Sequence, residues 1–281
     1  MKLGVTIQAT DQAMHPVEVA REAEARGFHS LYIPEHTHIP TSRRTPPPDG
    51  ADVLPDEYRR SPDPYIALAA AASVTEKILL GTGIGLPAQH DPITFAKQIS
   101  TLDWMCQGRF VFGIGYGWNH EEMENHGIVV RKRRAHVRET MLAMQALWAN
   151  DVASFDGEFV RFEASWQWPK PIQRPRPRIL IGGGAGPILF SHIAEYADGW
   201  MPFGGAGMSA ELDKLRIAFA ENDRDPDELH IVPMGIFPSD EKLDYFQKMG
   251  VTEVVLRIPS AGRDEVLPVL DDYVQYLKHF S

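Results

Sequence analysis

Apolar and polar positions follow two alternating patterns along the chain. Short apolar runs, typical of buried strands, alternate with longer segments in which apolar residues recur every three or four positions, as in amphipathic helices. The predicted strands are Leu3–Ile7, Leu31–Pro34, Ile78–Leu86, Arg109–Gly115, Arg178–Gly182, Gly199–Phe203, His230–Phe237 and Glu253–Ile258. The predicted helices are Pro16–Arg26, Pro64–Thr75, Pro92–Met105, Arg134–Trp148, Leu189–Tyr196, Ala210–Glu221, Lys242–Met249 and Glu265–Phe280.

This alternation predicts an α/β fold, specifically a (β/α)₈ TIM barrel. A doubly wound open sheet is the alternative. The barrel is favoured because polar or glycine-rich stretches repeatedly follow the predicted strand ends. Active-site loops at the carboxyl ends of barrel strands have this composition.

Two segments interrupt the alternation. Residues 40–62 are rich in proline and polar residues and long for a connection, which is typical of a functional loop or lid. Residues 153–177 contain "FDGEFVRF", a small predicted hairpin, and "WQWPKPIQRPRP", an extended crossing stiffened by proline. Trp166 and Trp168 in this crossing are interpreted as a cover for the barrel rim, with a cap over a ligand as the alternative.

Composition narrows the class of protein. A chain of 281 residues with 43% hydrophobic residues and no low-complexity linker predicts a single domain over residues 1–281. The formal charge of -10 gives no general attraction to nucleic acid or to an anionic membrane, so a small-molecule partner is favoured. Cys106 is the one cysteine, which excludes an intrachain disulfide and a cysteine-rich zinc site. The chain shows no signal-peptide pattern, and we expect a cytoplasmic protein.

A glycine-rich turn follows the fifth predicted strand. In "RILIGGGAGPILF" a strand leads into Gly183, Gly184, Ala185 and Gly186, and then into a helix that begins near Pro187. Backbone N–H groups in such a turn can approach a phosphate, and the helix N-terminus favours the negative charge. A tight turn would need one or two glycines at most, so we expect phosphate binding. The spacing does not match a Rossmann fingerprint or a P-loop.

Two further glycine clusters, "LLGTGIGLP" and "FGIGYGW", lie at neighbouring strand ends. Glycine weakens a strand, so these clusters indicate either a bulge with a flat ligand against the backbone or close packing at a crowded barrel end. Two clusters side by side favour the flat ligand.

Glu35, His36 and His38 follow the second predicted strand. Two histidines spaced in this way begin the metal site of some barrel hydrolases, because imidazole is a common metal ligand. The later strand ends offer neither His nor Asp, which leaves only His90 and His120 as further ligands. A zinc hydrolase that uses His36 and His38 is therefore kept as the alternative from another class, and no metal is expected.

Several motifs together resemble one family. The stretches "YIPEHTHIPTSRRTPPP", "LLGTGIGLPAQHDP", "AKQISTLDWMCQGRFVFGIGYGWNHEEMENHG", "PKPIQRPRP" and "GGGAGP…AEYADGW" are similar to the luciferase-like monooxygenase superfamily, in its actinobacterial branch of F420-dependent oxidoreductases. The resemblance covers nearly the whole chain. It implies a (β/α)₈ barrel with F420 or a flavin at the C-terminal mouth.

The resemblance also implies roles for individual residues. It places the active-site histidine at His36, after the acid Glu35, and a cis peptide bond that supports the cofactor ring at Gly83–Ile84. It places the rest of the cofactor site at Gly115, Gly117, Trp118, Asn119, Gly183, Gly184, Ala185 and Gly186. Trp118 departs from the sugar-phosphate enzymes, which have a glutamate there. We expect this departure to leave one titratable group and an apolar wall, suited to reducing a conjugated or carbonyl-bearing substrate.

The predicted function is hydride transfer between F420 and a small organic substrate, with His36 as the catalytic residue and a homodimer as the assembly. An FMN-dependent monooxygenase is the nearest alternative, and a cofactor-binding protein without turnover is a third.

Overall fold

The computed structural model describes residues 1–47 and 53–278 of the chain. Residues 48–52 of the predicted lid loop, and the last residues of the predicted C-terminal helix, lie outside this description. The strands are β1 Lys2–Thr6, β2 Ser30–Ile33, β3 Leu79–Thr82, β4 Phe110–Ile114, β5 Ala153–Asp156, β6 Arg161–Ser165, β7 Arg178–Gly182, β8 Gly199–Met201, β9 His230–Ile231, β10 Met234–Ile236 and β11 Glu253–Arg257.

The main sheet is parallel and curls until its ends meet. Its order is β10-β11-β1-β2-β3-β4-β7-β8-β9, so β9 and β10 form the two ends. Only Val232 and Pro233 separate β9 from β10. The N–H of Val232 bonds to β8, whereas the carbonyl of Pro233 accepts a bond from β11, so these two residues connect the two ends of the sheet. Proline cannot donate a hydrogen bond, which interrupts the one strand predicted over His230–Phe237. The predicted α/β class is confirmed, and the ladder is consistent with an eight-stranded barrel.

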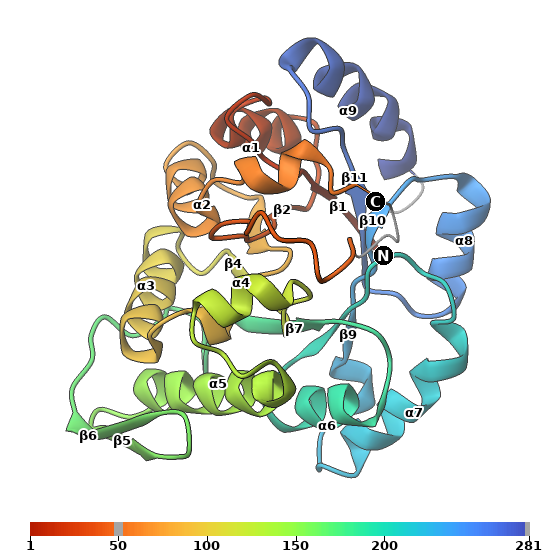
Figure 1. Cartoon of the computed structure of the whole chain (residues 1–281). Helices are drawn as coiled ribbons and strands as arrows, with labels where there is room; N and C mark the ends of the chain where they lie inside the picture. The colour runs from red at the N-terminus through yellow and green to blue at the C-terminus, as the bar shows by residue number, and fades with distance from the viewer. Residues whose placement is uncertain (48–52, 279–281) are drawn as a thin grey trace.

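The helices surround this sheet (Figure 1). They are α1 Pro16–Ala25, α2 Pro64–Ala72, α3 Pro92–Met105, α4 His120–Asn125, α5 Arg133–Ala149, α6 Pro187–Tyr196, α7 Ser209–Ala220, α8 Asp240–Lys248 and α9 Arg263–Leu277, with four short 3-10 helices Asp56–Arg60, Pro87–Gln89, Val130–Lys132 and Pro226–Glu228. One large apolar core lies between helices and sheet, and a smaller one around Tyr32, Met201 and Val255 fills the space inside the curled sheet. Within the described residues, no helix has the length and apolar character needed to cross a membrane.

The segment between β6 and β7 lies on the outside of the molecule. The predicted hairpin is confirmed as the antiparallel pair β5 and β6. Trp166 and Trp168 follow it, and both are exposed. The side chain of Gln167, between them, donates to the carbonyl of Ile93 in α3 at 2.9 Å. The two tryptophans therefore lie beside α3 on the outer surface, which differs from the predicted cover of the barrel rim.

Several glycines of the second and third clusters are required by packing within the sheet. A Cβ at Gly113 would lie 2.0 Å from the carbonyl oxygen of Thr82, and one at Gly115 would lie 1.9 Å from the side chain of Ile84. A Cβ at Gly81 would lie 2.5 Å from the ring of Tyr32. Protein atoms occupy these spaces, so packing accounts for these glycines without a flat ligand.

Gly113→Ala should therefore destabilise the protein by roughly 3 kcal/mol or more, because the clash is with backbone that cannot move alone. Gly184→Ala, where a Cβ meets nothing within 4 Å, is the matched control and should stay within about 0.5 kcal/mol of the original. Urea unfolding followed by circular dichroism measures both. Equal stability of the two variants would contradict this account of the sheet.

Candidate active site at the carboxyl ends of the strands

Glu35 lies just beyond β2 and is almost fully buried. One carboxylate oxygen accepts hydrogen bonds from the Tyr65 hydroxyl at 3.0 Å and from the Leu86 backbone N–H at 2.6 Å. The other oxygen lies 2.6 Å from Nε2 of His90. Burial of the Tyr65 hydroxyl, and then the nearby Glu35 charge, raise the pKa of Tyr65 well above its usual value. All of these partners are protein groups, so Glu35 holds α2, β2 and the segment after β3 together.

The segment after β3 turns sharply at Gly83–Ile84, whose peptide bond is cis as predicted. The strand expected over Ile78–Leu86 is observed over Leu79–Thr82. The side chain of Ile84 approaches the positions where Gly115 and Gly182 lack side chains, and it packs against the apolar cluster inside the sheet. Ile84 thus forms a floor at the carboxyl ends of β4 and β7.

His36 is buried beside the mouth and forms a pair with Glu122 of α4. Its Nδ1 lies 2.7 Å from a carboxylate oxygen of Glu122, and the other oxygen of Glu122 accepts the Thr37 backbone N–H at 3.1 Å. The indole N–H of Trp118 points to His36 Nε2 at 3.4 Å. A carboxylate can only accept, so Nδ1 carries the proton and Nε2 presents its lone pair.

Aromatic rings enclose His36. The rings of Tyr58 and Trp118 lie 5.5 and 5.7 Å from the His36 ring, centroid to centroid, and 5.9 Å from each other at nearly right angles. Tyr58 belongs to the 3-10 helix Asp56–Arg60 in the predicted lid segment. Tyr58 of the lid and Trp118 of the loop after β4 therefore pack around the same side chain, that of His36.

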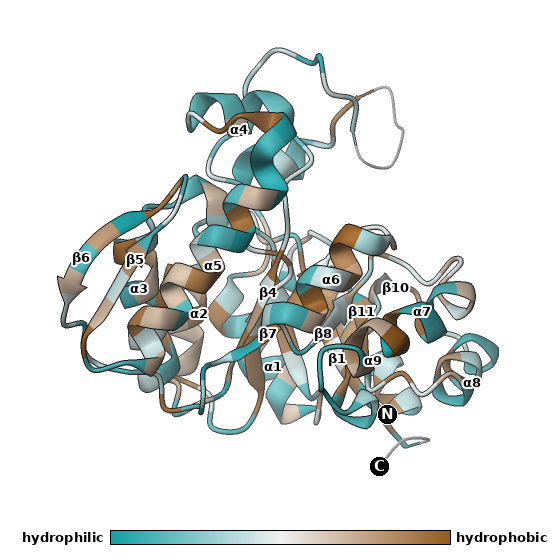
Figure 2. Cartoon of the chain, turned by 90° about the horizontal axis from the view of Figure 1, so that it is seen from below, coloured by the Kyte–Doolittle hydropathy of each residue, from teal (hydrophilic) through white to brown (hydrophobic). Residues whose placement is uncertain are grey.

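The lid segment is attached to α4 through the neighbouring carboxylate. Glu121 is buried and accepts hydrogen bonds from the backbone N–H groups of Arg44 at 2.6 Å and Thr45 at 3.1 Å, and from the Thr45 hydroxyl. Burial alone would raise the pKa of the Glu121 carboxyl, but the bonds from Thr45 and Arg44 lower it to about 2. In Figure 2, α4 and the loop before α2 project together from one end of the molecule.

Asn119 begins α4 without capping it. Its side chain is 1% exposed, and both polar atoms of its amide lack a hydrogen-bond partner among the described residues. Buried amides are normally paired, so an unpaired one beside Trp118 indicates a position for a bound polar group. Gly117, two residues earlier, has a φ of +78°, a conformation that favours glycine.

His38 points away from His36. It is exposed, and its ring nitrogens lie 2.9 Å from the Thr37 hydroxyl and from the Asn125 amide. His90 is bound to Glu35 and stacks on Phe95. In the described part of the chain, no group of three or more His, Cys, Asp or Glu residues is placed to hold a metal ion. His36 and His38 therefore do not form the start of a hydrolase site.

The glycine turn after β7 is open to solvent. Gly183, Gly184 and Ala185 are exposed, and a Cβ at Gly184 or Gly186 would meet nothing within 4 Å. Helix α6 begins after this turn with no side chain capping its first N–H groups. The N–H groups of the turn are thus free to meet a ligand, in contrast to the glycines of the other two clusters.

The pairing of His36 with Glu122 was not predicted from the sequence. We expected Trp118 to leave one titratable group here, and this expectation is wrong because Glu122 supplies a second group four residues later. The signal was present as two adjacent acids in "NHEEMENHG", but six residues with little apolar periodicity do not predict a buried helix.

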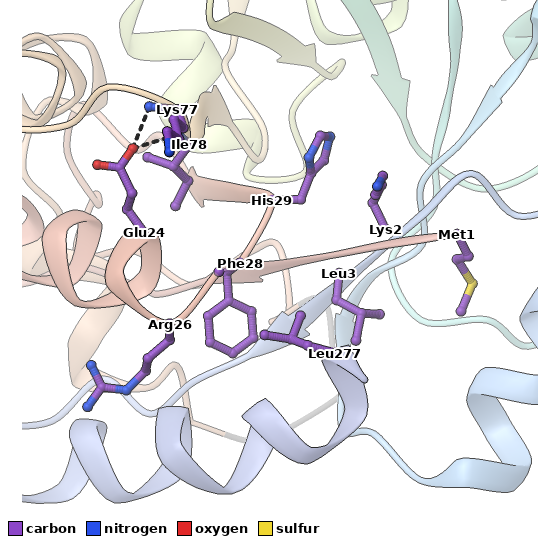
Figure 3. Close-up of a pocket in the computed structure, with 11 residues that line it drawn as sticks. Met1, Lys2, Leu3, Glu24, Arg26, Phe28, His29, Lys77, Ile78 and Leu277 are labelled. Atoms are coloured by element: carbon purple, nitrogen blue, oxygen red, sulfur yellow. Dashed lines mark hydrogen bonds between the residues drawn. The ribbon is translucent and has the colours of Figure 1, made fainter. Parts of the chain in front are cut away.

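A cavity of about 420 Å³ lies at the opposite end, where β1, β2 and β3 begin. Figure 3 shows Phe28, Leu3 and Leu277 on one side of it and Lys2 and His29 on another. None of its lining residues belongs to the candidate active site.

The family described as luciferase-like monooxygenase matches residues 2–244. The chain is 40% identical over 271 residues to "Uncharacterized protein Rv0953c" of Mycobacterium tuberculosis, which covers 94% of each chain. It is 30% identical over 173 residues to an FMNH(2)-dependent dimethylsulfone monooxygenase of Pseudomonas putida, with 59% of this chain and 45% of that one covered. It is 26% identical over 212 residues to an F420-dependent glucose-6-phosphate dehydrogenase of Amycolatopsis mediterranei, with 73% and 58% covered.

Solved structures share the fold. Monooxygenase RslO1 from Streptomyces bottropensis superposes with a TM-score of 0.79 at 21% identity, over all of both chains. An F420-dependent secondary alcohol dehydrogenase superposes with a TM-score of 0.76 at 18% identity, over 98% of this chain and 97% of that one.

The lid attachment generates a pH prediction. Because the folded-state pKa of Glu121 is lowered from 4.5 to about 2, its contribution to stability is complete above pH 4.5 and is lost as the pH falls towards 2. The difference in Tm between the original protein and Glu121→Gln should thus be constant above about pH 5.5 and should shrink below 4.5. Glu241→Gln, at an exposed acid of α8, is the control. A difference that does not change down to pH 3 would contradict this role.

Proposed function

The chain belongs to the luciferase-like monooxygenase family, and from this premise we propose that it is an F420-dependent oxidoreductase built on a (β/α)₈ barrel. It transfers a hydride between F420 and a small, largely apolar alcohol or carbonyl compound. The observation that carries this proposal is the buried pair of His36 and Glu122 at the carboxyl end of β2. Such a pair is suited to moving the proton that accompanies each hydride.

Residues at the mouth fit a cofactor of this kind. The open turn Gly183–Gly186 would hold its phosphate through backbone N–H groups. Ile84 would lie beneath its ring system, and the unpaired Asn119 amide would meet a polar ring substituent. When bound, F420 supplies the carbon that accepts or releases the hydride.

His36 would handle the proton. Its Nδ1–H donates to Glu122, and its Nε2 lone pair, which accepts the Trp118 indole N–H at 3.4 Å, would act as a base for a substrate hydroxyl that takes the place of the indole N–H. The imidazolium that forms is stabilised by the Glu122 carboxylate, as in other acid–histidine pairs. In the reverse direction the same imidazolium returns the proton to a carbonyl oxygen. Since Glu122 supplies the second titratable group, the proposal covers both directions of hydride transfer.

The walls around His36 determine the class of substrate. Tyr58 and Trp118 present apolar ring surface next to Nε2, and no carboxylate other than Glu122 is bonded to His36. A substrate with a large charged group would lose its hydration there without gaining a partner. A compact alcohol or ketone with apolar flanks fits these walls.

The relatives support a redox cofactor of either kind. Named relatives use F420 or FMNH(2), as their names state. FMN is therefore the alternative outcome of the cofactor test, and a hydrolytic function has no support from either the histidine geometry or the relatives.

Titration of the purified protein with F420 and with FMN tests the cofactor. We expect F420 fluorescence to be quenched with a Kd at least tenfold lower than that for FMN. Gly184→Asp should weaken F420 binding by at least tenfold, because a carboxylate would face the phosphate. Gly262→Asp, at the open N-terminus of α9, is the matched control and should bind F420 unchanged. Tighter binding of FMN would identify FMN instead of F420 as the cofactor. An unaltered Kd for F420 in Gly184→Asp would show that the turn is not part of the cofactor site.

Steady-state kinetics test the proton transfer, once a substrate alcohol or ketone is found by screening. His36→Ala should lower turnover by roughly 10²-fold or more. Glu122→Gln should lower it by about 10-fold or more, because the amide stabilises the imidazolium poorly. His38→Ala, two residues away and exposed, should keep turnover within twofold of the original. Full activity in His36→Ala would exclude His36 as the group that transfers the proton.

A further inference from the structure

The layer of side chains inside the sheet at its amino end is polar. It comes from the first residue of each of four strands, namely Ser30, Arg178, His230 and Glu253. Each lies two positions before a member of the apolar cluster inside the sheet, and side chains alternate along a strand, so all four belong to the layer below that cluster. Layers inside a barrel are usually filled by branched apolar side chains. A layer with charged groups is a departure from that packing.

The guanidinium of Arg178 is half-buried and has no bonded counter-ion. Among the residues that the structure describes, none forms a hydrogen bond or an ion pair with it. Glu253 lies in the same layer, but its carboxyl group accepts hydrogen bonds from the hydroxyls of Ser30 and, at 3.5 Å, of Tyr32. Burial raises the pKa of Glu253 to about 7, so this acid is only partly ionised near neutral pH. A half-buried cation without a bonded anion is costly.

Two histidines at this end lie in a positive electrostatic field. Burial lowers the pKa of His230 to about 4, and the charge of Arg178 contributes to this shift against an opposite effect of Asp198. Burial also lowers the pKa of His29, with further contributions from Lys2 and Arg178. Lys2 and His29 are seen together beside the first cavity in Figure 3. Both imidazoles are therefore neutral at pH 7, and each has one N–H to donate.

Arg178 and His230 line a second cavity, of about 410 Å³. The other charged residues of its lining are Arg174, Arg176, Arg224, Asp198, Asp227 and Glu228. Oδ1 of Asp198 accepts bonds from Arg176 at 3.0 Å and from Arg224 at 3.2 Å, so this acid offsets those two arginines. Asp227 and Glu228 are exposed. Four arginines against three acids leave an excess of one positive charge, in a chain whose formal charge is -10.

We propose that this second cavity binds a phosphate group, free or on a small molecule, through the guanidinium groups of Arg174 and Arg178 and an N–H of His230. A planar guanidinium donates two parallel hydrogen bonds to phosphate oxygens. In the described part of the chain, the guanidinium of Arg174 has no bonded partner either. The phosphate would supply the counter-ion that Arg178 lacks. The volume of the cavity falls in the range of small-molecule sites, about 300–1,000 Å³, which leaves room for an organic part.

This cavity is separate from the glycine turn Gly183–Gly186. Arg178 begins β7 and Gly183 follows the end of that strand, so roughly 16 Å of extended backbone lies between them. The proposal therefore does not rest on the proposed function. A long nucleic acid is a poor occupant, because the chain as a whole is negatively charged and exposed acids lie at this cavity.

Isothermal titration calorimetry with inorganic phosphate, glycerol 3-phosphate and succinate tests the ligand. Arg178→Gln should weaken phosphate binding roughly tenfold or more, because the amide lacks the charge and the paired donors of the guanidinium. Arg174→Gln, at an exposed position, should weaken it about threefold or more and keeps the test valid if Arg178→Gln does not fold, which circular dichroism checks. Arg21→Gln, at an exposed arginine of α1, is the matched control and should bind phosphate unchanged.

The three ligands separate the outcomes. Tighter binding of glycerol 3-phosphate identifies a phosphate ester as the ligand, whereas equal or tighter binding of inorganic phosphate identifies the free ion. Succinate that binds as tightly as either phosphate compound would overturn the assignment to phosphate. An absence of phosphate binding at about 10 mM, or unchanged binding in both arginine variants, would overturn the proposal altogether.

Cysteine labelling locates the bound phosphate, since the glycine turn is expected to bind phosphate as well. The single native cysteine, Cys106, is fully buried, and burial raises the pKa of its thiol to about 11, so it should react slowly. Asp227→Cys places a thiol at the second cavity, and Gln247→Cys places one on the exposed surface of α8.

Saturating phosphate should slow the reaction of a maleimide at Asp227→Cys by roughly threefold or more, because a nearby anion covers the thiol and disfavours the reactive thiolate. The rate at Gln247→Cys should not change, and combination of Asp227→Cys with Arg178→Gln should abolish the protection. Equal rates at Asp227→Cys with and without phosphate would place the bound phosphate elsewhere and overturn the proposal.

Discussion

A carboxylate that is removed from water must find hydrogen-bond donors for its oxygens, and this constraint shapes the mouth of the curled sheet. Glu35, Glu121 and Glu122 are each at most 3% exposed. Their donors come from α2, from the segment after β3, from the lid and from the β2 loop. Loops that have little apolar surface of their own are thereby held in one arrangement. Their attachment depends on electrostatics more than on apolar contact.

The sequence predicted the elements of the fold well and their connections at the site poorly. Strands such as Arg178–Gly182 and helices such as Pro92–Met105 have clear periodicity and caps, and their bounds agree with the structure. The interruption at Pro233 and the hairpin of β5 and β6 also have local causes. By contrast, the bond between His36 and Glu122 joins residues 86 positions apart through a six-residue helix that has no periodic pattern. Pairing of this kind depends on tertiary structure, which the pattern of apolar and polar residues in one sequence does not reveal.

The glycine clusters illustrate the same limit. Sequence alone cannot distinguish a glycine that makes room for a ligand from one that makes room for another part of the chain. Gly113 and Gly115 lie against Thr82 and Ile84, while Gly184 and Gly186 face open space. The sequence pattern favours a ligand contact for all three clusters. Only the open turn Gly183–Gly186 has a geometry that supports a ligand contact. The other two clusters shape the floor on which a ligand would lie.

The surface divides into regions with different physical demands. The mouth carries buried charge and, at the start of α6, an exposed glycine turn without a side-chain cap, which suit a polar, phosphate-bearing ligand. At the side of the molecule, α3 packs against α2 and α5 (Figure 1). Helices α2 and α3 follow β2 and β3, the strands whose ends carry His36 and the Gly83–Ile84 turn. Because Tyr65 of α2 donates to Glu35, packing at the outer surface of α2 is connected through one hydrogen bond to the carboxylate that holds the segment after β3.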